Sequence, residues 1–147
     1  MKSMKSMKSI GVVAAVLALA AGTFAQDAKK AGAALEGTWT LGSLNGKSLE
    51  GGPSLLLTFE GGKYHQTLDN TVNERGTYKI DTSKTPMTID LAIAEGDDAG
   101  KTQLGVFEVT GDKLRANLAI PGATERPKDF TISEAGLMFE AARRVKM

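Results

Sequence analysis

The stretch Leu35-Glu36-Gly37-Thr38-Trp39-Thr40-Leu41 decides the fold class, because it has the pattern of the first strand of a β-barrel. It holds the only tryptophan of the chain, and Trp39 and Leu41 lie on the same face of an extended segment. A strand at the open edge of a sheet needs a partner, because its unpaired backbone groups otherwise invite aggregation. We therefore expect the chain to end in a strand that returns to pair with this one.

Apolar and polar residues alternate through most of the remaining chain, with glycine, asparagine, aspartate or proline at short intervals. This pattern predicts short antiparallel strands joined by tight turns. The strongest turn signals are Asn45-Gly46, Gly61-Gly62 and Gly111-Asp112. The expected strands carry Leu55/Leu57/Phe59, Tyr64/Gln66/Leu68, Tyr78/Ile80, Met87/Ile89/Leu91/Ile93, Leu104 to Val109, and Leu114/Ala116/Leu118/Ile120. We expect loops at residues 69–74, 95–101 and 121–127, and an eighth segment that begins at Phe130 and Ile132 and resumes at Leu137.

The last segment, Leu137 to Lys146, is compatible with two structures. Its many good helix formers favour a helix on propensity alone. The same residues alternate, however, with Phe139, Ala141 and Arg143 on one face, and the first strand needs a partner. We therefore predict a strand, and the fold class is an all-β, antiparallel up-and-down barrel of about eight strands.

The first 25 residues have the three parts of a signal peptide. Lys2, Lys5 and Lys8 precede the apolar run from Ile10 to Ala21, and small residues in Thr23-Phe24-Ala25 indicate cleavage after Ala25. The run is shorter than the about 20 apolar residues that a membrane span needs. We predict export to the periplasm or the medium without a membrane span, a flexible leader at residues 26–34 and one barrel domain at residues 35–147.

Composition excludes several classes of function. The chain has 18 basic and 17 acidic residues and no cysteine, so it offers neither a basic tract for nucleic acid nor thiol chemistry. His65 is the only histidine, and no Gly-x-Ser-x-Gly motif accompanies it, so we predict no enzyme. Gly42 to Ser48 and Gly96 to Thr102 have the wrong glycine spacing for a phosphate-binding loop. We predict no cofactor and no metal site.

The ordered set of short motifs resembles a known family. Leu35-x-Gly37-x-Trp39, Gly76-Thr77-Tyr78-Lys79-Ile80-Asp81, Gly111-Asp112-x-Leu114, and Pro121-Gly122 followed by Arg126-Pro127-x-x-Phe130 resemble exported bacterial lipocalin-like proteins of uncharacterised function. The resemblance implies a barrel closed at one end by a basic residue that lies across the indole, and Trp39 and Arg143 are the matching positions. Such a contact is favourable by about 0.5–2 kcal/mol. Related proteins often carry a cysteine where this chain has Asn117, so no role of that thiol carries over.

The favoured function is binding of a small apolar or amphipathic molecule inside the barrel, because eight strands can enclose one small ligand. Strand phase places six residues near such a pocket: Tyr64, Tyr78, Ile89, Leu91, Phe107 and Leu118. The alternative is a protein-interaction or inhibitor-type envelope module that acts through its loops. Glu108 faces either the pocket or the surface, and we favour the surface because buried charges need partners. Arg126 lies either at the pocket mouth or in an ordinary surface ion pair, which we favour.

Overall fold

The computed structural model describes residues 30–144, and the predicted signal peptide lies outside these residues. Nine strands form within this range, and together they make one antiparallel sheet. They are β1 (Gly37–Leu44), β2 (Lys47–Ser48), β3 (Leu55–Glu60), β4 (Lys63–Leu68), β5 (Thr71–Asp81), β6 (Met87–Glu95), β7 (Thr102–Thr110), β8 (Lys113–Ala119) and β9 (Gly136–Arg143). No helix in the described part of the chain has the length and apolar character needed to cross a membrane.

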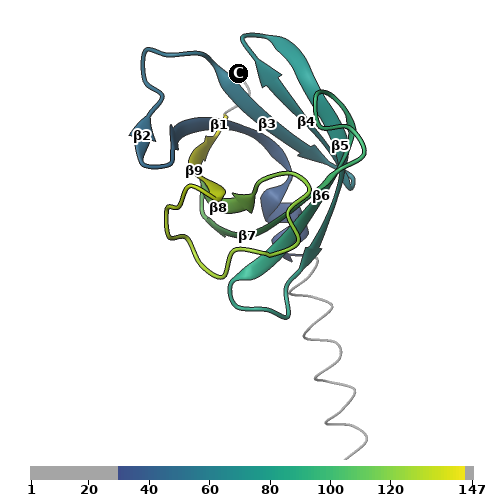
Figure 1. Ribbon diagram of the computed structural model, residues 1–147. Helices are drawn as coiled ribbons and strands as arrows, with labels where there is room; N and C mark the ends of the chain where they lie inside the picture. Colours follow the sequence, from purple (N-terminus) through teal and green to yellow (C-terminus); the bar gives the residue numbers. More distant parts are fainter. Residues whose placement is uncertain (1–29, 145–147) are drawn as a thin grey trace, which may run out of the picture.

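Eight strands, all except the two-residue β2, close into a barrel (Figure 1). Each strand pairs with the next one along the chain, and β9 returns to pair with β1. Trp39 lies opposite Arg143 in this closing pair, and Leu41 lies opposite Ala141. The predicted up-and-down barrel is confirmed, and so is the strand at the C-terminal end. The helix that propensity favours does not form there, because β9 supplies hydrogen-bond partners to both β1 and β8.

One face of every barrel strand points inward, and the inward residues are mostly large and apolar. The most deeply buried side chains are Trp39, Phe107, Leu35 and Leu114, each with less than 2% of its surface exposed. The core also contains Leu41, Leu57, Phe59, Tyr64, Ile89, Leu91, Ala116, Leu118, Phe139 and Ala141. This packing follows from the period-two sequence pattern, because successive side chains of a strand point to opposite faces.

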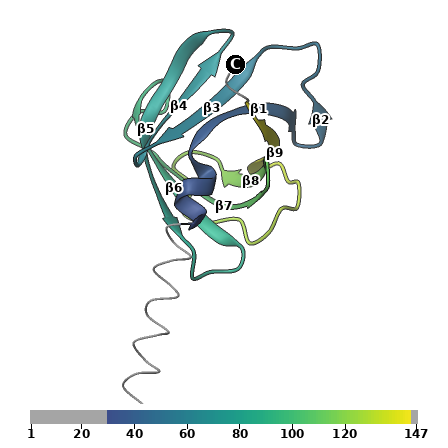
Figure 2. The same ribbon diagram turned by 180° about the vertical axis from the view of Figure 1, so that it is seen from behind.

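A short helix at residues 30–35 covers one end of the barrel (Figure 2). Its last residue, Leu35, is 1% exposed and belongs to the core. The indole Nε1 of Trp39 donates a hydrogen bond to the carbonyl oxygen of Leu35 at 2.8 Å. We expected a flexible leader at residues 26–34, and for residues 30–34 that expectation is wrong. The helix forms because burial of Leu35 anchors it on the barrel.

The hairpin of β4 and β5 corrects a second expectation. We expected a loop at residues 69–74, whereas only Asp69 and Asn70 form the turn and β5 already begins at Thr71. Both turn residues have positive φ angles, 48° and 70°, as tight hairpins require. Residues 71–74 are strand because they pair with β4, with a bulge between Gln66 and Thr67. Backbone hydrogen bonds, rather than burial of apolar side chains, keep residues 71–74 in the strand. The pattern of apolar residues in the sequence therefore does not predict a strand there.

The connection from β8 to β9, residues 120–135, is the longest loop within residues 30–144 and lies on the outer face of the barrel. Asn117 of β8 is 4% exposed, and its Nδ2 donates to the carbonyl oxygens of Asp129 and Thr131 at 2.8 and 3.2 Å. Phe130 and Ile132 therefore belong to this loop, and the strand segment predicted there does not form. Ile120 also lies beyond β8, with half of its surface exposed.

Candidate functional site

The six predicted pocket residues all point into the barrel. Five are buried: Tyr64, Ile89, Leu91, Phe107 and Leu118. Tyr78 is partly buried, and its ring packs against that of Phe59 at 5.1 Å between centroids.

The hollow described between the core side chains measures only about 10 Å³, with Ile89, Leu91, Phe107 and Leu118 among the residues that surround it. One water molecule needs about 10–15 Å³, and pockets for small molecules usually measure about 300–1,000 Å³. Side chains therefore fill the interior.

A polar pair on β4 and β5 interrupts this apolar interior. The hydroxyl of Tyr64 donates a hydrogen bond to Oε2 of Glu74 at 3.0 Å. Burial raises the pKa of the Tyr64 hydroxyl well above its usual range, and the Glu74 carboxylate raises it further. Burial also raises the pKa of Glu74, although the hydrogen bond from Tyr64 opposes this effect. Glu74 was not among the predicted site residues, because residues 69–74 were assigned to a loop.

The barrel is sealed beside the helix by Trp39 and Arg143. The guanidinium carbon of Arg143 lies 4.4 Å from the centre of the indole ring. Its Nη1 and Nη2 atoms also donate hydrogen bonds to the carbonyl oxygens of Glu36 and Ala34. This side chain therefore ties β9 to the short helix and to the start of β1, which is a structural role.

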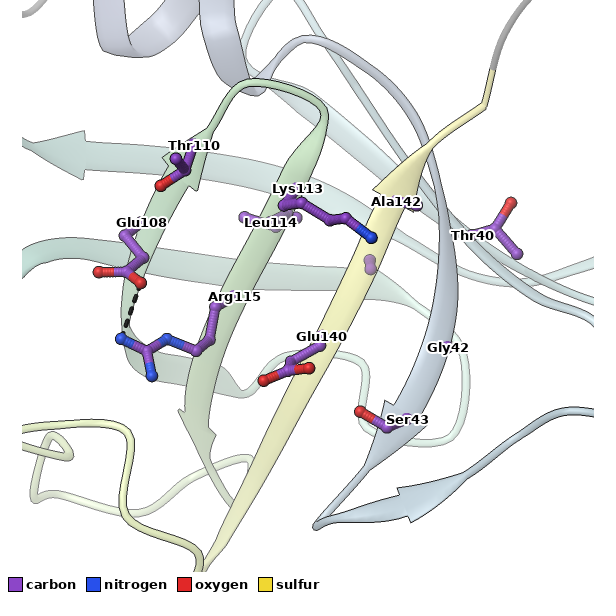
Figure 3. Close-up of a pocket in the computed structure, with 11 residues that line it drawn as sticks. Thr40, Gly42, Ser43, Glu108, Thr110, Lys113, Leu114, Arg115, Glu140 and Ala142 are labelled. Atoms are coloured by element: carbon purple, nitrogen blue, oxygen red, sulfur yellow. Dashed lines mark ion pairs between the residues drawn. The ribbon is translucent and has the colours of Figure 1, made fainter.

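The widest hollow of those described lies on the outside of the barrel, over β1, β7, β8 and β9, and we call it the outer groove (Figure 3). Its volume is about 820 Å³. It is lined by Thr40, Gly42 and Ser43 of β1, Glu108 and Thr110 of β7, Lys113, Leu114 and Arg115 of β8, and Glu140, Ala141 and Ala142 of β9. The floor over β1 and β9 is formed by small residues, so the backbone there is accessible to another molecule.

Charged side chains form the rim of the outer groove. Glu108 and Arg115 make an ion pair of 2.7 Å, the dashed contact in Figure 3. Arg115 also lies over the ring of Phe130, with its guanidinium carbon 4.0 Å from the ring centre. Glu108 therefore lies on the outer face, as the sequence favours, rather than inside the barrel. Lys113 and Glu140 complete the rim and carry opposite charges.

Three comparisons of this chain, with protein-family models, with curated proteins and with solved structures, find no match. The resemblance to lipocalin-like proteins therefore stays a prediction. The barrel itself rests on the strand pairing described above.

Two other outer hollows are smaller than the outer groove. One, of about 510 Å³, lies over β3 to β6 and includes His65, which faces outward opposite Arg75. The other, of about 440 Å³, lies between the turn after β5 and the long loop. In residues 30–144 no group of three or more histidine, aspartate or glutamate side chains is arranged to hold a metal ion.

Arg126, from the long loop, borders the second of these hollows, and it forms the ion pair that the sequence favours together with two hydrogen bonds to the backbone. Its Nη2 lies 2.7 Å from a carboxylate oxygen of Asp90. Its Nη1 donates to the carbonyl oxygens of Gly105 and Ile89 at 2.9 and 3.2 Å. One side chain therefore fastens the loop across β6 and β7, and this part of the loop is fixed rather than free to bind.

Proposed function

We propose that this protein binds a macromolecular partner on the outside of its barrel, across the outer groove. This is the interaction-module alternative of the sequence analysis, with its binding surface moved from the loops to the strand face beside the longest loop. The predicted export would bring the partner within reach in the periplasm or the medium.

One contrast carries the proposal: about 10 Å³ of space inside the barrel against about 820 Å³ in the outer groove. A ligand inside would have to displace side chains such as Phe107 and Leu118, at the cost of their packing. A partner in the outer groove displaces only solvent. The groove combines small floor residues with paired and unpaired charges at its rim, which suits the polar rim of a protein interface.

Binding of a small apolar molecule inside the barrel stays a second prediction. The barrel fold supports it, since barrels of eight strands in other proteins hold small ligands. The filled interior weighs against it, because the core would have to rearrange to admit even a small molecule.

Site-specific photo-crosslinking in cells that express the protein tests the proposal. A photo-reactive phenylalanine analogue replaces Thr110 at the groove rim, and a matched control replaces Thr77, an exposed threonine on the outer face of β5. We expect a discrete protein adduct from position 110 that is absent from position 77. The adduct should disappear when Ala142→Arg fills the groove floor. Equal adducts at both positions, or none at position 110, would overturn the proposal.

A further inference from the structure

We infer that the partner seated on the outer groove is a second copy of this chain, which forms a symmetric dimer through reciprocal Lys113–Glu140 ion pairs. This inference rests on the proposed function, because it names the partner for the same surface. Two features of the groove support it: the arrangement of its charges and the geometry of its strands.

The charges are self-complementary. Glu140 lies directly opposite Arg115 in the β8–β9 register, yet Arg115 pairs with Glu108 and stacks on Phe130. Neither Glu140 nor Lys113 has an ion-pair partner among residues 30–144. The groove therefore presents one positive and one negative charge that neighbouring strands leave unmatched, and a second copy supplies the complement of both.

Strand register fixes where these charges lie. Lys113 pairs with Ala142, and Glu140 is two residues before Ala142 on β9, so Lys113 and Glu140 are diagonal neighbours. Consider two such faces related by a two-fold axis that lies between them, over the midpoint of the Lys113–Glu140 diagonal and perpendicular to it. This axis places Lys113 of each copy over Glu140 of the other, which is the reciprocal contact of an isologous interface.

The same axis sets the angle between the two sheets. With strands about 4.8 Å apart and about 3.4 Å between residues, it crosses the strands of the two copies at about 70°.

Ala142 lies where the two faces must come closest. The spacings between strands and between residues along a strand place Ala142 about 1.5 Å from the axis, measured in the plane of the sheet. Ala142 is exposed, and its neighbours across β1 are Thr40 and Gly42, so no long side chain holds the copies apart.

Sedimentation equilibrium of the whole protein, purified from cells, tests the inference. We expect a reversible dimer that salt weakens, because its ion pairs are partly solvated. Lys113→Glu and Glu140→Lys should each raise the dimer dissociation constant about tenfold, because both reciprocal pairs become repulsive. The double variant that exchanges the two charges should restore the dimer. A matched exchange outside the groove, Lys84→Glu with Glu50→Lys, should leave the constant unchanged.

Cysteine crosslinking locates the axis independently, since the natural chain has no cysteine. A short bis-maleimide should join two chains that both carry Ala142→Cys. It should not join two chains that carry Ala94→Cys, on the outer face of β6. A protein that stays monomeric at every soluble concentration, or a dimer insensitive to both charge reversals, would overturn the inference. In that case an adduct at position 110 with a different protein would leave the proposed function standing, and no adduct would overturn both.

Discussion

Truncation of Phe107 tests whether the barrel interior is filled. Phe107 is 1% exposed, lies opposite Met87 on β6 and Ala116 on β8, and borders the small residual space. Loss of the buried ring removes about 2–3 kcal/mol of hydrophobic stabilisation. The cavity adds to this cost because hydrogen-bonded strands on all sides prevent collapse, so we expect Phe107→Ala to lose about 3–5 kcal/mol.

Urea denaturation followed by tryptophan fluorescence measures this loss. Trp39 is the only tryptophan and is fully buried, so its emission reports directly on the core. The dependence of the unfolding free energy on urea should stay unchanged while the midpoint falls. Phe130→Ala is the matched control, because Phe130 lies on the outer surface against Arg115 and should lose only about 1 kcal/mol.

A small apolar probe gives the second readout. Benzene should raise the unfolding midpoint of Phe107→Ala, which has a new dry cavity, and leave the natural protein unaffected. A loss below about 1 kcal/mol for Phe107→Ala would show that the ring contributes little packing. Stabilisation of the natural protein by benzene would show that the interior already has room for a ligand. Either result would refute the reasoning behind the filled interior.

Three further predictions concern single side chains. Burial raises the folded-state pKa of Glu74, so its ionisation destabilises the barrel above that pKa. Glu74→Gln should therefore raise the free energy of unfolding at neutral pH. The difference in unfolding free energy between this variant and the natural protein, measured by urea titration, should vanish at acid pH. Arg126→Met should cost about 2 kcal/mol through lost hydrogen bonds to strand carbonyls, whereas Lys128→Met should cost less than about 0.5 kcal/mol by the same assay. Gly76→Ala should cost more than about 3 kcal/mol or prevent folding, because its Cβ would overlap the backbone carbonyl oxygen of Ala92. Gly42→Ala meets only ordinary contacts and should unfold at nearly the same temperature.

Much of the barrel could be predicted because its inward faces follow a period of two. Leu57 and Phe59 on β3, or Ile89 and Leu91 on β6, alternate with less buried residues, and that alternation is visible in the sequence. Arg143 opposite Trp39 was expected from the resemblance to lipocalin-like proteins, and the closing pair of β1 and β9 places the two residues opposite each other. The start of β5 and the course of the long loop could not be predicted this way, because backbone pairing and contacts between distant residues decide them.

The candidate site could be predicted only in part. Strand phase indicates which side chains point inward, but whether they leave a cavity depends on how their volumes meet across the barrel, which no local pattern contains. The outer groove depends on small residues at outward positions of β1 and β9, about 100 positions apart in the chain. The small residues Gly42 and Ala142 are the part of the groove that is visible in the sequence. They indicate a groove only once the register between β1 and β9 is known.

Native mass spectrometry of the protein purified from cells separates a dimer from a chain that carries a ligand, because it weighs the chain together with whatever is bound to it. We expect a species of two chains, in equilibrium with a single chain that carries no additional small molecule. We also expect that charge reversal at Lys113 or at Glu140 alone shifts this equilibrium toward the single chain. Extra mass of small-molecule size on the single chain, lost after denaturation and refolding, would contradict the account and establish the interior as the binding site.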